Sequence, residues 1–517
     1  MVTKTMSVKV KNKRGIPFPF HIVYSALSVL AQVVFLIVLG FYLSEHSLLV
    51  YTLSEFAAIV TVIWIINRRG NPSYKIPWLV FILIFPIFGI MMFMLSGGGR
   101  VTPYLKKRMQ RCEDKYIGSL QDSEEIQATL RYADYLHSRQ ADYLVGESGY
   151  PLYKNTAVDF LAPGEAFLPR FLDELERAKK YIYIEFFIVA EGVMWDSICE
   201  VLERKVREGV EVKLLFDDFG SIKRQRKDFI WKLRKIGIEV AVFNKIRPSV
   251  DLFMNNRNHR KIVVIDGKTA ITGGLNLADE YINEFERFGY WMDSAVILKG
   301  DAVKSFLAMF CSTWEFTTGK SIDMEAHISE EFAIAEGFVL PYGDGPLDDK
   351  NPAEGIYMQI LSTAQKYVYI TSPYLIIDNA MINSLKMAAK SGIDVRIITP
   401  AVPDKWYVHP VTQYNYLELL EAGIRIYEYT PGFLHSKIFV SDDSVATVGT
   451  VNMDYRSFNL HFECGVWMAS NKTVKDIREH FKELLSVSQE ITLESWYNTP
   501  RIVRFKRAIL HIFAPFM

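Results

Sequence analysis

Two stretches of this chain follow one pattern of residues: His259-Arg-Lys-Ile-Val-Val-Ile-Asp266 and His435-Ser-Lys-Ile-Phe-Val-Ser-Asp442. Each has His-x-Lys, four intervening residues and then Asp. Glycine follows each Asp after seven positions, in Gly273-Gly-Leu-Asn276 and Gly449-Thr-Val-Asn452. Two such matches with equal internal spacing indicate an internal repeat rather than coincidence.

The flanking sequence is duplicated as well. Lys180-Tyr-Ile-Tyr-Ile184 matches Lys366-Tyr-Val-Tyr-Ile370, and Gly209-Val-Glu-Val-Lys-Leu-Leu215 matches Gly392-Ile-Asp-Val-Arg-Ile-Ile398. A third pair of strand-like runs covers 235–240 and 422–426. Apolar strands that alternate with amphipathic helices predict an α/β fold, here of two βαβ-rich domains. The glycine before each second strand fits a helix C-cap that turns into the sheet.

The repeat divides the chain into regions with different expected structures. These are a basic tail (1–19), a transmembrane region (20–97), a linker or helical region (98–150), a first domain (151–320), a second domain (321–490) and a C-terminal amphipathic segment (491–517).

The motif spacing predicts that His and Lys share one face of a strand, because side chains two residues apart point the same way. Asn276 and Asn452 follow the next strand of each hairpin and can return beside them. Two repeats packed about a pseudo-twofold axis would bring together His259, Lys261, His435, Lys437 and both Asn side chains. Such a cage suits a phosphodiester, with one His as nucleophile and the other as acid and base. Lys and Asn would stabilise charge on the phosphate oxygens, and no metal or cofactor is required.

Four carboxylates are further candidates. Asp266 and Asp442, the last residues of the two motifs, fall at hairpin turns, where a structural role in bonding turn amides outweighs a catalytic one. Asp293 and Glu463 lie at the head of apolar strand-like runs. Either they orient the reactive imidazoles, or they are ordinary charges at strand ends.

Bulk composition narrows the function. The formal net charge is zero and the pI is about 7.1, which argues against a strongly basic nucleic-acid binder. The mean hydropathy of +0.09 is high for a water-soluble chain. The cysteines have neither CxxC nor Cys/His ligand spacing, so we expect free thiols without a disulfide framework or zinc site; they are Cys112, Cys199, Cys311 and Cys464.

The apolar excess lies near the N-terminus. Residues 20–43 and 76–95 carry no Asp, Glu, Lys or Arg, and 48–66 is interrupted only by Glu55. Each is long enough for a bilayer core of about 30 Å, so two or three spans are expected, and three are favoured. A cleaved signal peptide is the weaker alternative, because the first run is too long and no small-x-small site follows. Flanking Lys and Arg give only a weak bias for orientation.

These residues resemble the phospholipase D superfamily, whose members carry two HKD motifs. Tyr427 to Lys437, Asn452-Met-Asp-Tyr-Arg-Ser-Phe458 and Arg68-Arg-Gly-Asn-Pro72 are similar in particular to bacterial cardiolipin synthases. The resemblance implies that two phosphatidylglycerols give cardiolipin and glycerol through a covalent phosphohistidine. It also implies that Asp293 and Glu463 lie against the imidazoles, and it favours His259 as nucleophile. Thr450 departs from the Ser of many relatives, but its hydroxyl can still donate.

The resemblance implies a multi-pass protein of the cell membrane, with a phospholipid membrane, phosphatidylglycerol and cardiolipin as partners and no nucleic acid. The alternative is a membrane-tethered phosphodiesterase that hydrolyses phospholipid or nucleic acid; an inactive scaffold is disfavoured by the two intact motifs. The C-terminal segment either lies in an anionic membrane surface or packs on the domain. The other histidines lack a paired Lys or a recurrence and are interpreted as structural or surface residues; they are His21, His46, His137, His327, His409, His461, His480 and His511.

Overall fold

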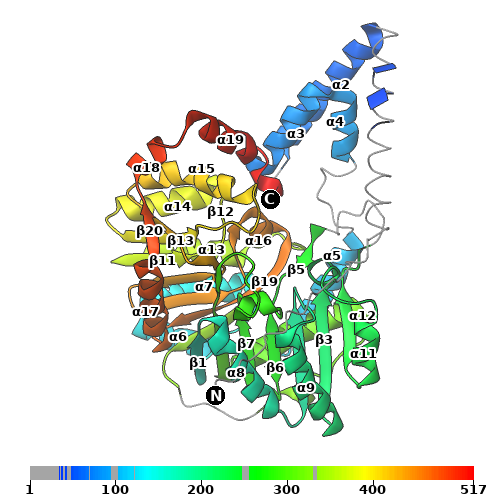
Figure 1. The fold of residues 1–517 in the computed structure, drawn as a ribbon, viewed down its shortest axis with the longest axis vertical. Helices are drawn as coiled ribbons and strands as arrows, with labels where there is room; N and C mark the ends of the chain where they lie inside the picture. The colour runs from blue at the N-terminus through cyan, green and yellow to red at the C-terminus, as the bar shows by residue number, and fades with distance from the viewer. Residues whose placement is uncertain are drawn as a thin grey trace, which may run out of the picture.

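The structure is a computed structural model. It describes residues 34, 37–38, 41–42, 48–68, 70–94, 103–121, 123–246, 255–329 and 335–517. Figure 1 shows two α/β halves in contact, with helices α2, α3 and α4 projecting away from them beside the C-terminus.

Each half is built on one mixed sheet, and the two sheets share a strand order. The first has the order β1-β9-β7-β6-β2-β3-β4, and the second has β10-β19-β17-β16-β11-β13-β14 with β20 added at its edge. In the first sheet β2, β3 and β4 run parallel, and in the second β11, β13 and β14 do. The remaining strands of both sheets are antiparallel to their neighbours. The predicted α/β duplication is confirmed.

The first half comprises β1 (Thr156–Leu161), α8 (Gly164–Glu176), β2 (Tyr181–Phe186), α9 (Val193–Arg207), β3 (Glu211–Asp217), α10 (Asp218–Ser221), α11 (Phe229–Lys235), β4 (Glu239–Phe243), β5 (Arg257–Asn258), β6 (Ile262–Ile265), β7 (Thr269–Gly273), η3 (Asp279–Ile282), β8 (Tyr290–Met292), β9 (Ala295–Gly300) and α12 (Val303–Thr318). The second comprises η4 (Glu325–His327), β10 (Phe338–Asp344), α13 (Pro352–Thr363), β11 (Tyr367–Thr371), β12 (Leu375–Ile376), α14 (Asn379–Lys390), β13 (Asp394–Pro400), α15 (Val408–Glu421), β14 (Arg425–Tyr429), β15 (Gly432–Leu434), β16 (Ile438–Ser441), β17 (Val445–Gly449), β18 (Met453–Asp454), α16 (Tyr455–Asn459), β19 (His461–Ala469), α17 (Thr473–Ser486), β20 (Ser488–Ile491), α18 (Leu493–Tyr497), α19 (Arg501–His511) and η5 (Ala514–Phe516). Before them come α2 (Leu48–Asn67), α3 (Pro72–Ile84), α4 (Pro86–Met92), α5 (Pro103–Ile117), α6 (Glu124–Ala133) and α7 (Tyr135–Ser148).

The helix-to-strand turns explain part of the repeated sequence. Gly209 and Gly392 follow α9 and α14 with φ of +90° and +91°. This left-handed conformation favours glycine, because a Cβ would clash with the neighbouring backbone. The predicted C-cap role of both glycines is therefore confirmed.

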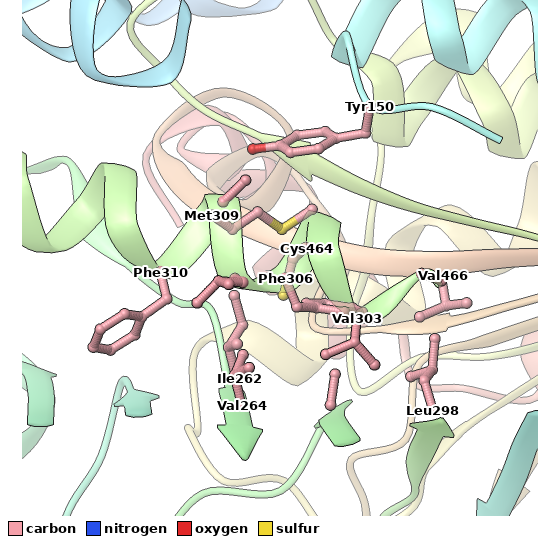
Figure 2. Packing of buried hydrophobic residues seen from close by; sticks show 14 of the residues in the cluster. Tyr150, Ile262, Val264, Leu298, Val303, Phe306, Met309, Phe310, Cys464 and Val466 are labelled. Atoms are coloured by element: carbon pink, nitrogen blue, oxygen red, sulfur yellow. The ribbon is translucent and has the colours of Figure 1, made fainter. Parts of the chain in front are cut away.

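One large apolar cluster contains residues of both halves. Ile262 and Val264 of β6 belong to one buried cluster with Val466 of β19 and with Phe306 and Met309 of α12 (Figure 2). All five side chains are fully buried, and burial of each contributes about 1.5–3 kcal/mol. Because strands of both sheets line this cluster, the two halves are fixed relative to each other.

Short strands cross from each half to the other just before the two motifs. β5 pairs in parallel with β19, so that Phe462 lies opposite Asn258. β15 pairs in parallel with β8, so that Met292 lies opposite Leu434. The prediction of one continuous strand from His through Lys is therefore wrong. The chain pairs with β19 or β8 before each His, and with β2 or β11 only after each Lys.

The N-terminal helices differ from the expected spans. The run 20–43 falls almost wholly outside the described residues, and 48–66 lies within α2. The run 76–95 is not one helix: α3 ends at Ile84 and α4 begins at Pro86, which has no N–H to continue the hydrogen-bond ladder. Within the described ranges, no helix is both long and apolar enough to cross a membrane.

These helices are attached to the second half. The Tyr74 hydroxyl of α3 donates to the backbone carbonyl of Tyr455 at 3.1 Å, and Asn71 Nδ2 donates to Asp378 at 2.8 Å. The rings of Trp78 and Phe516 lie 6.1 Å apart, edge to face. All four cysteines are free; Cys112, Cys311 and Cys464 are buried, and Cys199 is half-buried.

Candidate active site

One cavity of about 1320 Å³ is lined by residues of both halves. His259 and His435 both line it, as do Asn276 and Asn452. The two motifs, far apart in sequence, therefore contribute to one cavity. Lys261 and Lys437 are buried and do not line the cavity.

Each imidazole is held by a carboxylate from the opposite half. His259 Nδ1 lies 2.9 Å from both carboxylate oxygens of Glu463, and His435 Nδ1 lies 2.7 Å from Asp293 Oδ2. Both carboxylates are completely buried. The crossing strands cause this exchange, because β5 and β15 deliver each His to the strand that carries the other half's acid.

Burial sets the charge state of the imidazoles. It lowers the pKa of His259 to about 3. It lowers the pKa of His435 to about 4, and the nearby Lys437 ammonium adds to the effect. Both rings are therefore neutral near pH 7. With Nδ1–H donated to a carboxylate, Nε2 of each ring keeps its lone pair.

The two lysines sit directly behind the imidazoles. Lys261 Nζ donates to the His259 carbonyl at 2.7 Å, and Lys437 Nζ donates to the His435 carbonyl. Burial lowers the pKa of Lys261 to about 8 and that of Lys437 to about 7. A phosphate anion in the cavity would favour the charged form of both ammonium groups.

The two asparagines have different partners. Asn276 Oδ1 accepts from the Ile188 N–H at 3.0 Å, and its Nδ2 donates to the Tyr281 hydroxyl at 2.7 Å. Asn452 Oδ1 is buried and has no hydrogen-bond partner within the described chain. The Asn452 carboxamide is thus held by fewer hydrogen bonds than that of Asn276.

The residues after each Gly of the hairpin support the carboxylates. A Cβ at Gly274 would approach Asp293 Oδ1 to 2.0 Å, so glycine makes room for this carboxylate. At the equivalent position, the Thr450 hydroxyl donates to Glu463 Oε2. The expectation that the Thr450 hydroxyl can still donate a hydrogen bond, in place of the Ser of many relatives, is therefore confirmed.

Asp266 and Asp442 lie away from the cavity. The Asp266 carboxylate accepts the backbone N–H groups of Lys179, Lys180 and Tyr181 at 2.7–2.8 Å. Asp442 accepts in the same way from residues 365–367 at 2.7–2.9 Å. Each carboxylate ties a hairpin turn to the start of the neighbouring central strand, β2 or β11.

Replacing Asp266 with alanine is expected to lower the free energy of unfolding by about 3 kcal/mol, because three N–H groups lose a charged acceptor. Chemical denaturation in detergent measures the loss. Asp159→Ala is the control: this exposed carboxylate pairs with Arg170 at the surface, and its loss should cost less than about 0.5 kcal/mol. A folded Asp266→Ala protein with normal stability and no turnover would contradict the structural role.

The cavity residues that the sequence analysis did not predict include His461 and Arg456. His461, interpreted as structural or surface, lines the cavity with its ring centroid 5.4 Å from that of His259. Arg456 also lines the cavity. A signal for His461 did exist, because it stands two residues before Glu463 on β19 and so faces the same way.

A metal ligand set can be tested at the same place. His259, His461 and Glu463 offer donor atoms within 4.8 Å of one another, the single such group among the described residues. The Glu463 carboxylate already accepts from His259 and Thr450. Hydrogen bonding accounts for this arrangement, and the expectation that no metal is needed stays a prediction.

The family model described as "Cardiolipin synthase, PLD-like domain" matches residues 171–314 and 357–485. The chain belongs to the cardiolipin synthase family of phospholipase D-like proteins. The two matched segments correspond to the two halves of the fold, and a second model, "Phospholipase_D-nuclease N-terminal", matches residues 56–98. Family membership thus extends over the N-terminal helices as well as both halves of the site.

Two relatives and one solved structure are similar to this chain over most of its length. Cardiolipin synthase 2 of Bacillus anthracis is 33% identical over 90% of this chain and 91% of its own length. An uncharacterized protein of Streptococcus mutans is 41% identical over 84% of this chain and 94% of its own. The phosphatidylserine synthase of Haemophilus influenzae superposes with a TM-score of 0.54 at 14% identity, covering 73% of this chain and 98% of that one. The last similarity concerns the fold alone.

Proposed function

We propose that this protein is a membrane-bound cardiolipin synthase that transfers a phosphatidyl group from one phosphatidylglycerol to another. One observation carries the proposal: two neutral imidazoles line one cavity, and each is oriented by a buried carboxylate. The names of the cardiolipin synthase relatives support the choice of phosphatidylglycerol as substrate. The proposal includes His259 and His435 as the reactive pair and Asp293 and Glu463 as the acids that orient them. It also includes the limits 151–320 and 321–490 for the two domains.

In the first half-reaction, Nε2 of one imidazole attacks the phosphorus of a phosphatidylglycerol. The phosphorus–oxygen bond to the headgroup glycerol breaks, and a phosphohistidine forms. The anionic phosphate in the cavity favours the protonated form of the second imidazole. This imidazolium supplies its proton to the departing alkoxide, so that glycerol leaves as a neutral alcohol. Lys261 and Lys437, which lie behind the imidazoles and not on the cavity wall, place positive charge near the phosphate oxygens and so stabilise the charge that develops on them.

In the second half-reaction, the now neutral acid–base imidazole removes a proton from the headgroup hydroxyl of another phosphatidylglycerol. The oxygen attacks phosphorus, the bond to histidine breaks, and cardiolipin is released. The proton stays on the acid–base imidazole and restores the starting state. Water in place of the second lipid would give phosphatidic acid, so that exclusion of water decides between transfer and hydrolysis.

The proposal includes a multi-pass anchor within residues 20–97 and a site beside the cell membrane. Large apolar side chains are exposed on the N-terminal helices and on α19, as expected for a surface that faces lipid; they include Phe56, Ile59, Ile63, Leu83, Ile84, Ile502, Phe505 and Ile509. Arg501, Arg504 and Lys506 lie on α19 among them and suit an anionic membrane.

The test is an assay of products from purified protein and phosphatidylglycerol vesicles. Cardiolipin and free glycerol in equal amounts are expected. Phosphatidic acid without cardiolipin would instead identify a lipid hydrolase. Vesicles of phosphatidylcholine are the control, because their headgroup offers no acceptor hydroxyl and should give no cardiolipin.

A further inference from the structure

The two halves of the cavity wall carry different residues at equivalent positions. Two residues before the orienting carboxylate, the first half has Trp291 and the second has His461. Four residues after the motif Asn, the first half has Glu280 and the second has Arg456. All four line the cavity. The approximate twofold symmetry of the chemistry is therefore broken, and at these two positions the basic residues belong to the second half.

The arginines of the cavity wall differ in whether they are paired. Arg224 and Arg287 both form ion pairs with Glu280, the latter at 2.8 Å. In the part of the chain that the structure describes, no carboxylate forms an ion pair with Arg456. Its Nε lies 3.5 Å from His461 Nε2. A guanidinium on a cavity wall that forms no ion pair with a carboxylate can bind an anion.

His461 connects this arginine to the reacting centre. Its Nδ1 makes no hydrogen bond among the described residues and lies 3.5 Å from Glu463 Oε1. Its ring is close to both residues: the centroid lies 5.4 Å from that of His259, and Nε2 lies 3.5 Å from Arg456 Nε. One imidazole thus separates Arg456 from a reactive histidine, a gap that a three-carbon glycerol bridge can span.

We propose that Arg456 and His461 bind the phosphodiester of the acceptor lipid during transfer. The inference rests on the proposed function and deepens it, because cardiolipin is a glycerol that joins two phosphates. One phosphate occupies the phosphohistidine site. The other, carried by the acceptor, pairs with the Arg456 guanidinium, and this pairing places the acceptor hydroxyl beside the reactive imidazoles.

The position of Arg456 suits a lipid that arrives from the anchor side. α16 carries Arg456, and its first residue, Tyr455, contacts Tyr74 of α3 through a hydrogen bond and an edge-to-face ring contact. Phe516 and Met517 line the same cavity close to α3. A headgroup at Arg456 would therefore leave its acyl chains near apolar residues and the N-terminal helices.

The subsite predicts selectivity for a phosphate-bearing acceptor. Free glycerol has the same hydroxyl but no phosphate, so it cannot use Arg456. The experiment compares cardiolipin formation from phosphatidylglycerol vesicles with the exchange of radiolabelled free glycerol into phosphatidylglycerol. Cardiolipin formation and glycerol exchange share the first half-reaction. Only cardiolipin formation uses an acceptor that carries a phosphate.

For Arg456→Gln, the ratio of cardiolipin formation to glycerol exchange is expected to fall about 10- to 100-fold, as for loss of a charge-assisted pair. Arg456→Lys keeps the charge without the planar fork and should lie between. His461→Gln should lower the ratio in the same direction. Arg425→Gln, whose guanidinium pairs with Glu490 on the surface, is the control and should leave the ratio unchanged.

Outcomes separate this inference from the proposed function. An Arg456→Gln ratio equal to that of the parent overturns the subsite, even where both rates fall together. Glycerol exchange without any cardiolipin from the parent protein overturns the proposed function and the subsite with it. If Arg456→Gln does not fold, Arg456→Lys and His461→Gln provide the same comparison.

Discussion

Replacing His435 with alanine is expected to lower kcat/KM for cardiolipin formation by about 10⁴-fold or more, and His259→Ala is expected to do the same. Each imidazole supplies a lone pair or a proton that no neighbour can replace, because each belongs to its own carboxylate pair. The double variant should be no worse than either single variant, since both groups serve one reaction cycle.

The measurement is a product assay on folded protein, combined with trapping of ³²P from labelled phosphatidylglycerol. His480→Gln is the matched control, because this buried imidazole on α17 lies outside the cavity; it should keep its turnover. The single variant that still accumulates labelled protein identifies the nucleophile as the remaining histidine. A His→Ala variant that retains a tenth of parent activity would refute the two-histidine mechanism.

The duplication could be predicted because the same local pattern of apolar residues occurs twice in the sequence. β2 and β11, β3 and β13, and β4 and β14 all coincide with apolar runs that recur in the same order. Their glycine C-caps have the same left-handed conformation in both halves. These features depend on neighbours within a few residues, so a single sequence contains them.

The exchange of strands between the halves could not be predicted in the same way. β5 and β8 are two and three residues long, and a run of that length has no periodicity to read. Their partners lie in the other half of the chain. The sequence therefore offered Asp293 and Glu463 as orienting acids without stating which imidazole each would bind.

His461 shows a different limit. As an isolated histidine without a paired lysine, it matched the usual pattern of a structural residue. Its importance appears only when β19 is placed beside His259, because the contact crosses from one half to the other. The equivalent residue in the first half is Trp291, so comparison of the two repeats did not indicate a functional role for His461.

Asp293→Asn is expected to lower kcat by about 10³- to 10⁴-fold, as for other acids that fix the tautomer of a catalytic histidine. The Asn amide can donate to His435 Nδ1, which would move the ring proton to Nε2 and remove the reactive lone pair. Loss of the anion also lowers the pKa of His435 further below about 4. The limb of the pH–rate profile that reports His435 should therefore shift to lower pH, not higher.

The crossed pairing makes the prediction specific. ¹⁵N-histidine NMR reports the tautomer of each ring, and Asp293→Asn should alter His435 in the second half while leaving His259 unchanged. Glu463→Gln should do the reverse. Asp344→Asn is the control, because this buried acid bonds only backbone N–H groups at 2.7–3.1 Å and neither imidazole. If Asp293→Asn changed the tautomer of His259, the acids would be paired within the halves, and the crossing of β5 and β15 would lose its function.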